Sequence, residues 1–285
     1  MVIGLETPEV QGLGEALDAL RAWQDDAAPL QLHPGDVGWF WRFGADETAA
    51  ALRTWRRDGR IVAVGLLDGP DLLRLGISPD AQHDEELAHR LAEDAGRPER
   101  GVLGEGAVSV EAPVGALVVE HLAAAGWRQD ESWALLRRDL AEPVQDPGVP
   151  VRVVGPAEAR AWAEVLTSSF GGSTPAPERW HALATGLPYA DARCLLVGEG
   201  SAVVGVWSAG PGRPGLIEPM GVHADHRGRG LGRAVTLAGL AALRELGASS
   251  ALVATPSSNA GAVATYVSAG FGHLPARRDR RRDSA

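Results

Sequence analysis

Apolar residues follow two different spacings along the second half of the chain. Short apolar runs bounded by glycine, proline or polar residues predict strands at 151–154, 192–199, 202–210, 215–222, 250–255 and near 273–278. Apolar residues three or four positions apart predict helices at 158–170, 177–187, 233–247 and 259–270. Gly247 and Gly270 lie where helices commonly stop. We expect this half to form one α+β unit.

The first half shows the same two spacings. They predict helices at 12–23, 47–59 and 81–96, and strands at 71–77 and 132–140. Between the halves, the segment AEPVQDPGVP (141–150) contains three prolines and one glycine, a composition typical of a linker. The sequence therefore predicts two domains, residues 1–144 and residues 151–285.

The two halves also match each other in order and spacing. A strand ends in Gly76-Ile77 in the first half and in Gly221-Val222 in the second, 145 residues later. Similarly, Gly126-Trp127 precedes Gly270-Phe271 by 144 residues. Two copies of one unit, packed against each other as a pseudo-dimer, explain this agreement better than two unrelated domains do.

Length and composition fit a soluble chain of two globular domains. The chain has 285 residues, of which 45% are hydrophobic and 22% charged, and no apolar run is long enough to span a membrane. The N-terminal residues do not resemble an export signal, so we expect a cytoplasmic protein. The net charge of −10 argues against nucleic acid as a partner.

Cysteine and basic residues limit the possible chemistry further. The single cysteine, Cys194, can form no internal disulfide and is interpreted as a buried apolar residue. All basic side chains are arginine, so no lysine can form a Schiff base. The arginine-rich end, residues 277–285, is interpreted as a solvated or frayed tail, and contact with nucleic acid is the alternative.

The segment VHADHRGRGLGR (222–233) predicts an anion site. It joins a predicted strand to a predicted helix, and its glycines let the backbone approach a ligand closely. Free N–H groups at the helix start, the helix dipole and Arg227, Arg229 and Arg233 all favour a phosphate or pyrophosphate. The Walker A and dinucleotide-binding spacings are both absent.

A second motif follows about 27 residues later, in the order Asn259, Ala262, Tyr266, Gly270 and Phe271. Together with R-x-x-G-x-G, it resembles the GNAT superfamily of acyl-CoA-dependent N-acetyltransferases over residues 151–278. The resemblance implies an α+β chain of two tandem GNAT-like domains, each a mixed, mostly antiparallel sheet flanked by helices. It also implies acetyl-CoA as the cofactor and no metal.

The resemblance also implies which residues hold the cofactor. Its pyrophosphate would lie on the segment Arg227, Gly228, Arg229, Gly230, Leu231, Gly232 and Arg233. Its pantetheine arm would pair like a strand with Met220, Gly221 and Val222, where the fourth strand of the family fold splays from the fifth. Asn259 would bind the arm from the opposite side.

Two residues are predicted to move protons. The departing thiolate benefits from a proton, and Tyr266 is the expected donor because it lies two helical turns from Asn259 on the same face. The attacking amine must be neutral, and Glu218 is the expected base because family members often hold a carboxylate in that strand. His223 and His226 are the alternatives.

The first half lacks both motifs. The stretch that corresponds to the glycine-rich turn carries Gln82, Glu85 and Glu86, whose negative charge would repel a pyrophosphate. Gly115 and Leu122 stand opposite Asn259 and Tyr266. We therefore expect a degenerate copy that is structural or that shapes the acceptor site.

These observations predict acetyl transfer from acetyl-CoA to an amine of a small molecule or peptide, by direct attack in a ternary complex. A non-enzymatic acyl-CoA sensor or partner-binding module is the alternative. Trp162, Trp180 and Trp207 could line an acceptor pocket, although tryptophans at such spacings commonly belong to the core. Both a monomer and a homodimer are compatible with the sequence.

Overall fold

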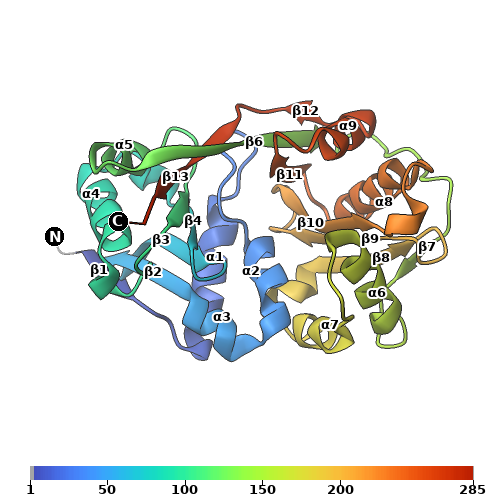
Figure 1. Cartoon of the computed structure of the whole chain (residues 1–285), viewed down its shortest axis with the longest axis horizontal. Helices are drawn as coiled ribbons and strands as arrows, with labels where there is room; N and C mark the ends of the chain where they lie inside the picture. The colour runs from blue at the N-terminus through green and yellow to red at the C-terminus, as the bar shows by residue number, and fades with distance from the viewer. Residues whose placement is uncertain (1–2, 285) are drawn as a thin grey trace.

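The computed structural model describes residues 3–284, and a single sheet runs through both halves of the chain (Figure 1). The strands are β1 (Ile3–Glu6), β2 (Leu52–Arg57), β3 (Arg60–Leu67), β4 (Leu72–Ile77), β5 (Val108–Glu111), β6 (Arg128–Asp139), β7 (Val151–Val153), β8 (Ala192–Val197), β9 (Ala202–Ser208), β10 (Gly215–Val222), β11 (Ser250–Pro256), β12 (Gly272–His273) and β13 (Arg277–Arg282). Their order is β1-β2-β3-β4-β5-β13-β6-β11-β10-β9-β8-β7, with β12 beside β6.

Helices cover both faces of this sheet. They are α1 (Leu13–Trp23), α2 (Pro34–Phe40), α3 (Ala45–Ala51), α4 (Glu85–Gly96), α5 (Val118–Ala124), α6 (Ala159–Phe170), α7 (Pro177–Ala184), α8 (Leu231–Glu245) and α9 (Ala260–Ser268). In the N-terminal half, α1, α2 and α3 share one apolar core, while α4 and α5 share another. In the C-terminal half, α6 and α7 belong to one core and α8 and α9 to a second. Within residues 3–284, no helix combines the length and the apolar character needed to cross a membrane.

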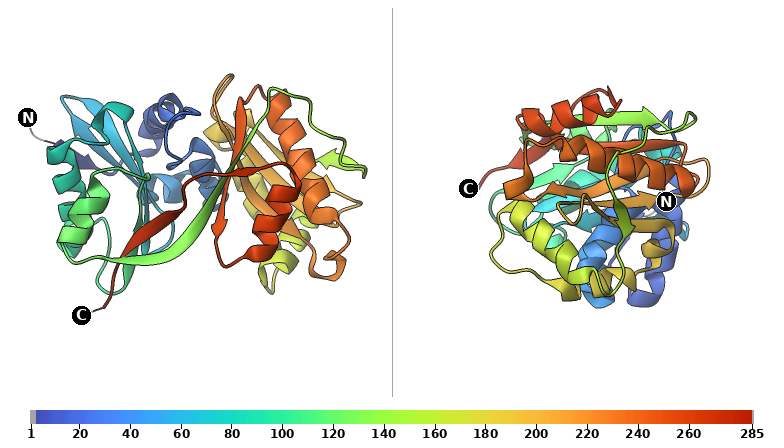
Figure 2. Two further views of the ribbon diagram at one scale, coloured as in Figure 1. Left: turned by 90° about the horizontal axis from the view of Figure 1, so that it is seen from above. Right: turned by 90° about the vertical axis from the view of Figure 1, so that its right-hand side faces the viewer.

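The two halves exchange strands across their boundary. Strand β6 of the N-terminal half pairs with β11 of the C-terminal half, and β13 returns from the C-terminal end to pair with β5 (Figure 2). Where β6 and β13 run side by side, Trp133 pairs with Arg277, which follows it by 144 residues. Repeat-related residues that face each other in an antiparallel pair mark a pseudo-twofold axis. The fold is thus the expected pair of repeated α+β units, joined by exchanged strands.

The prediction of a helix over residues 47–59 is wrong in its second part, which forms a strand. The segment 47–59 begins as helix α3, but the chain then turns into strand β2 at Leu52. Asp58 and Gly59 have φ angles of 52° and 80°, as a two-residue hairpin turn between β2 and β3 requires. The Asp-Gly pair is a strong hairpin signal, and the fully buried Trp55 gains its packing from the neighbouring strands.

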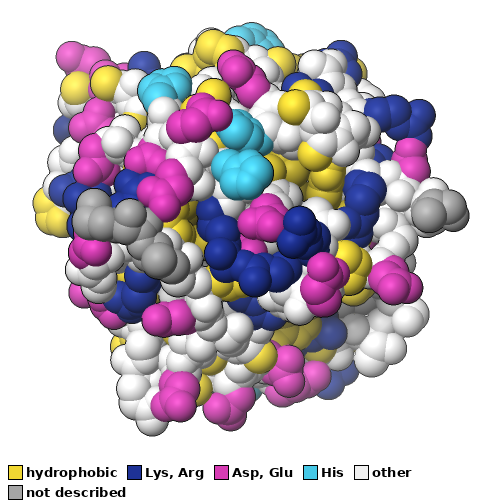
Figure 3. Space-filling model, turned by 90° about the vertical axis from the view of Figure 1, so that its left-hand side faces the viewer, with side chains coloured by type: hydrophobic (Ala, Val, Ile, Leu, Met, Phe, Trp, Pro, Cys, Tyr) yellow, Lys and Arg dark blue, Asp and Glu magenta, His cyan; other side chains and the backbone are white. Residues whose placement is uncertain are grey.

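The arginine-rich end is not a frayed tail, which corrects a second prediction. Residues 277–282 form strand β13, and Arg277 is only 3% exposed. Arg281 pairs with Asp283, and Arg282 donates to the carbonyls of Gly96 and Gly104. Figure 3 shows arginine side chains gathered on this end of the molecule with acidic side chains among them.

Candidate active site

A cavity opens where two neighbouring parallel strands separate. Strands β10 and β11 pair only at Gly215 with Ala251 and at Leu216 with Leu252, and then diverge. A cavity of about 490 Å³ is lined by the diverging segments 216–220 and 253–256, together with side chains of the N-terminal half. Strand separation therefore creates space where both halves meet.

The glycine-rich turn leads into helix α8 at the same end of β10. Gly228 and Gly230 have φ angles of 74° and 78°, a region that favours glycine. Gly230 is the N-cap, so the amides of Leu231, Gly232 and Arg233 lie in a first turn that offers them no helical acceptor. Within the described residues, no side chain caps this helix. The turn therefore presents backbone donors to an anion.

The arginines of the turn are held by neighbouring carbonyls. Arg227 donates to the Ser169 carbonyl at 2.8 Å, and Arg229 donates to the Asp225 carbonyl at 3.1 Å. Arg233 donates to the Ser268 carbonyl at 2.9 Å, which links α8 to the end of α9. These contacts fix the turn and leave the positive charges without an acidic partner among residues 3–284.

The free edge of β10 lies beside the cavity. Met220, Gly221 and Val222 pair with β9 on one side, whereas no described strand pairs with their other edge. Met220 lines the cavity. A Cβ on Gly221 would lie 2.6 Å from the Ser169 hydroxyl of α6, so only glycine fits there. An extended ligand could pair with this edge as a further strand would.

Asn259 and Tyr266 both line the cavity from helix α9, as their seven-residue spacing predicts. The Asn259 side chain caps the helix by accepting from the Ala262 amide at 3.2 Å. Tyr266 is 6% exposed and meets Phe271 edge to face. Burial and the nearby Glu218 raise the pKa of Tyr266, which keeps the phenol protonated.

Glu218 also lines the cavity, and it belongs to a cluster that the sequence did not predict. The Arg74 guanidinium lies 2.7 Å from Asp36 Oδ1 and 3.9 Å from Glu218 Oε1. Burial and the Asp36 charge raise the pKa of Glu218 well above its ordinary value. Burial opposes ionisation of Asp36, but Arg74 and a hydrogen bond with Glu218 hold the pKa of Asp36 low. These opposite shifts favour a protonated Glu218 beside an ionised Asp36.

Asp36 is positioned by the start of helix α2. Pro34 occupies the first helical position, the Gly35 amide donates to His33 Nδ1 at 2.9 Å, and the Asp36 carboxylate accepts from the His33 amide. The sequence HPGD carries this local signal of a helix start. The contact with Glu218 crosses from one half to the other, so no local pattern could reveal it.

Helix α2 reaches Glu218 because two glycines let it approach strand β9. A Cβ on Gly35 or Gly38 would lie 2.5 or 2.4 Å from the Trp207 side chain. The Trp207 indole donates to the Glu218 carbonyl at 2.6 Å. Trp207, which is 1% exposed, is therefore a core residue that fixes β10 at Glu218, and it is not among the residues that line the cavity.

Further charged residues complete the cavity wall. Arg74 lies 3.1 Å from Glu111, and Arg277 lies 2.8 Å from Glu111 and 2.7 Å from Asp279. Burial raises the pKa of Asp279 to about 6, with Arg277 opposing the shift. Sequence reasoning missed this network because its members come from strands β4, β5 and β13. The cavity wall holds more acidic than basic side chains.

The remaining chemical candidates lie elsewhere. His223 and His226 pack against each other and are not among the residues that line the cavity. Cys194 is a free, buried thiol whose pKa burial raises to about 12, as expected for an apolar role. Among residues 3–284, no group of histidine, cysteine, aspartate and glutamate is arranged to hold a metal.

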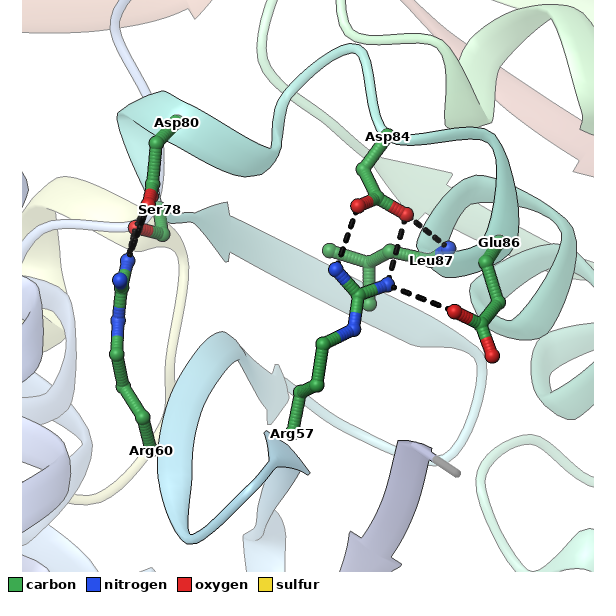
Figure 4. Close-up of polar contacts among 7 residues, drawn as sticks. All are labelled: Arg57, Arg60, Ser78, Asp80, Asp84, Glu86 and Leu87. Carbon is green, nitrogen blue, oxygen red and sulfur yellow. Dashed lines mark hydrogen bonds and ion pairs between the residues drawn. The ribbon is translucent and has the colours of Figure 1, made fainter. Parts of the chain in front are cut away.

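The corresponding place in the N-terminal half carries an ion pair between its two strands. Strands β4 and β5 pair at three positions, the last of them Arg74 with Glu111, and these two side chains form an ion pair in the wall of the same cavity. Helix α4 is capped by Asp84, which accepts from the Leu87 amide and pairs with Arg57 at 2.5 Å (Figure 4). An internal carboxylate thus occupies the helix start that α8 leaves open.

Comparisons with known proteins agree with this geometry. Residues 159–271 match the model of the acetyltransferase (GNAT) family. A mycothiol acetyltransferase of Cellulomonas flavigena is 32% identical over 65% of the chain and 58% of its own length. Another, from Geodermatophilus obscurus, is 28% identical over 90% of the chain and 86% of its own length. The match to the first relative therefore spans less than two thirds of that protein.

Solved structures share the fold over the whole chain. A GCN5-related N-acetyltransferase from Sphaerobacter thermophilus matches with a TM-score of 0.61 at 18% identity, covering 99% of this chain and 95% of its own. A tandem GNAT protein from the clavulanic acid biosynthesis pathway matches with a TM-score of 0.59 at 15% identity, covering 100% and 99%. Residues 159–271 therefore match the acetyltransferase (GNAT) family in sequence, and the chain as a whole shares the fold of solved GNAT proteins.

Proposed function

We propose that the chain transfers an acetyl group from acetyl-CoA to an amine in the cavity between β10 and β11. The observation that carries this proposal is that Glu218 of β10 and Asn259 and Tyr266 of α9 line one cavity. The open start of α8 follows the end of β10. Within this proposal, residues 151–285 form the acetyltransferase domain. Residues 1–144, joined through a linker at about 141–150, form a domain without a CoA motif.

The residues present fit acetyl-CoA. The first-turn amides of α8 and the positive-φ glycines suit a diphosphate, and the unpaired edge at Met220, Gly221 and Val222 suits an amide-bearing arm. The thioester supplies the acetyl group and a thiolate leaving group. Asn259 lines the same space from the start of helix α9.

Two residues of the cavity hold the protons that the reaction requires. Glu218, once ionised, accepts the proton of the incoming amine, directly or through water. Its raised pKa makes it a stronger base than an ordinary carboxylate. Tyr266 is protonated by virtue of its raised pKa and donates to the sulfur as the thiolate departs. The N-terminal half takes part through Asp36 and Arg74, which position Glu218.

Replacing Tyr266 by phenylalanine tests this assignment. Loss of the proton donor should lower kcat by about a hundredfold, as removal of a general acid commonly does, and leave CoA affinity nearly unchanged. Release of free thiol from acetyl-CoA with a panel of amines measures the rate. A mycothiol-type amine belongs in the panel, because the curated relatives are named mycothiol acetyltransferase.

Tyr189→Phe is the matched control, since Tyr189 is the other tyrosine of the chain and does not line the cavity. Equal losses in both variants would contradict the assignment of Tyr266. Tight CoA binding without thiol release for any amine would favour the second candidate, an acyl-CoA sensor. The buried network of Arg74 and Arg277 could equally well order a binding module of that kind.

A further inference from the structure

A second cavity adjoins the first on the side of helices α6 and α7. Its volume is about 310 Å³, and Trp39 and Phe170 line both cavities. The remaining walls come from α6, from α7 and from the end of α2, so both halves contribute to it again. A ligand with its reacting group beside Glu218 could therefore extend into this second space.

Two arginines in the second cavity have no acidic partner. Arg42 donates to the Trp39 carbonyl at 2.7 Å, and its guanidinium lies 4.2 Å above the Trp39 ring. Arg179 stacks on Phe43 at 5.4 Å. Within residues 3–284, no carboxylate forms an ion pair with either of them. By contrast, the buried Arg74 contacts four carboxylates.

Without an acidic partner, the positive charge of Arg42 is destabilised by burial. Burial lowers the pKa of Arg42 to about 10, with Asp68 and Glu218 opposing the shift from a distance. A partly buried cation without a counter-ion gains free energy when an anion binds beside it. Arginine also matches the planar shape of a carboxylate through paired hydrogen bonds.

The other walls of the second cavity are apolar and aromatic. Trp162 and Trp180 line it, together with Leu166 and Leu183. Two of the three tryptophans considered from the sequence thus line this second cavity, while Trp207 does not. The cavity therefore fits an apolar group that carries a negative charge.

The geometry points to a zwitterionic acceptor whose amine lies beside Glu218 and whose carboxylate binds Arg42 and Arg179, with an apolar group between them. The inference rests on the proposed acetyl transfer. The first cavity is lined by more acidic than basic side chains, and the second is lined by the unpaired Arg42 and Arg179. The positive amine of such a molecule is therefore attracted to the first cavity and its negative carboxylate to the second. A short peptide with an apolar side chain and a free carboxyl end has this chemistry.

Glycyl-phenylalanine and its C-terminal amide test the inference, because they share the amine and the aromatic ring and differ in the carboxylate. In the thiol-release assay, the free acid should have about a tenfold lower KM than the amide. The preference should disappear in Arg42→Gln and in Arg179→Gln. Arg160→Gln removes a positive charge on α6 outside both cavities and should leave the preference intact. Arg179 is exposed, so its variant should fold even if Arg42→Gln does not.

A binding measurement separates this inference from the proposed function. Calorimetry with N-acetyl-glycyl-phenylalanine and its amide, on protein loaded with CoA, should show the same tenfold preference for the acid. Preferential binding without turnover of any amine would overturn acetyl transfer and support the carboxylate site. Turnover with equal KM values for acid and amide, or a preference that survives both arginine replacements, would overturn the carboxylate site alone.

Discussion

The pKa of a single residue in the cavity can depend on partners in the other half of the chain. Glu218 is an ordinary strand residue in the sequence, but burial and Asp36 raise its pKa well above the usual value. Its suitability as a base therefore depends on a carboxylate more than 180 residues earlier in the chain. The sequence predicted Tyr266 from its position in the second motif and Glu218 from the resemblance to the family, but it gave no sign of the Asp36 carboxylate that raises the pKa of Glu218.

Replacing Asp36 by asparagine should change the pH dependence of the reaction. The Asp36 charge favours the protonated form of Glu218, so its removal should lower the pKa of Glu218. The acidic limb of the profile of kcat/KM should then move to lower pH. Asp71→Asn, an equal change of charge at an exposed position outside the cavity, should leave the limb in place. An unmoved limb in the Asp36 variant would refute the coupling.

His33 should make the folded state sensitive to acid. Burial lowers the pKa of His33 to about 4, below its ordinary value of 6.5, and outweighs the Asp36 charge and the hydrogen bond to the Pro214 carbonyl, which both oppose the shift. The unfolded chain therefore binds more protons than the folded chain between these pH values. Stability is full above pH 6.5 and falls as pH decreases toward 4, by about 3 kcal/mol.

His33→Asn tests this dependence, since asparagine can still cap α2 but does not titrate. The variant should be less stable than the wild type at pH 7, and the difference in free energy of unfolding should narrow toward pH 4.5. Urea unfolding across this pH range measures the difference. His181→Asn, at an exposed histidine of α7, provides the control. A difference that stays constant with pH would contradict the assignment of a neutral, buried His33.

At the scale of elements, local patterns predicted most helices and strands but not how they meet. The helices at 159–170, 231–245 and 260–268 and the hairpin of β8 and β9 follow their apolar spacing closely. The helix prediction for 47–59 failed in its second part. The first residues of this segment are strong helix formers, whereas strand β2 is stabilised by strands distant in the sequence and by the turn at Asp58 and Gly59. Tertiary contact outweighed local propensity there.

Helix α2 is the element that brings the two halves together at the site, and its packing can be tested. Gly38→Ala would place a methyl group 2.4 Å from the Trp207 ring, which should destabilise the protein by about 1–3 kcal/mol. It should also weaken amine binding, because α2 carries Asp36 and Trp39. Urea unfolding and KM measure these effects.

Gly14→Ala is the matched control for this substitution. Gly14 lies in helix α1, and an added Cβ would meet nothing within 4 Å. Alanine there should leave KM unchanged and should stabilise the helix by up to about 1 kcal/mol. Equal destabilisation by both substitutions would mean that the close contact between α2 and Trp207 does not exist.

At the scale of the whole molecule, duplication and strand exchange place residues of both halves around the candidate site. The repeat offset found in the sequence reappears as the pairing of Trp133 with Arg277. The exchange of strands could not be predicted, because the sequence of β13 alone is typical of a charged tail. The exchange places Arg277 and Asp279 in the cavity wall, so the last strand of the chain contributes to a candidate site between the halves.

The two halves also differ physically at the places that correspond to the glycine-rich turn and to the separation of β10 from β11. The sequence predicted repulsion of a pyrophosphate by the acidic residues of this stretch. In the structure, Asp84 caps α4 and pairs with Arg57, and Arg74 with Glu111 keeps β4 and β5 together. A ligand would have to displace these ion pairs, so we expect a single CoA site in the chain.

Calorimetric titration of the protein with acetyl-CoA tests the central claim most directly. We predict one site per chain, with affinity reduced about tenfold in Gly230→Ala, where φ is 78° and alanine is strained. Gly126→Ala, at a φ of 87° between α5 and β6, imposes the same strain away from the site and should bind normally. Two sites per chain, no binding, or unchanged affinity in Gly230→Ala would contradict the account.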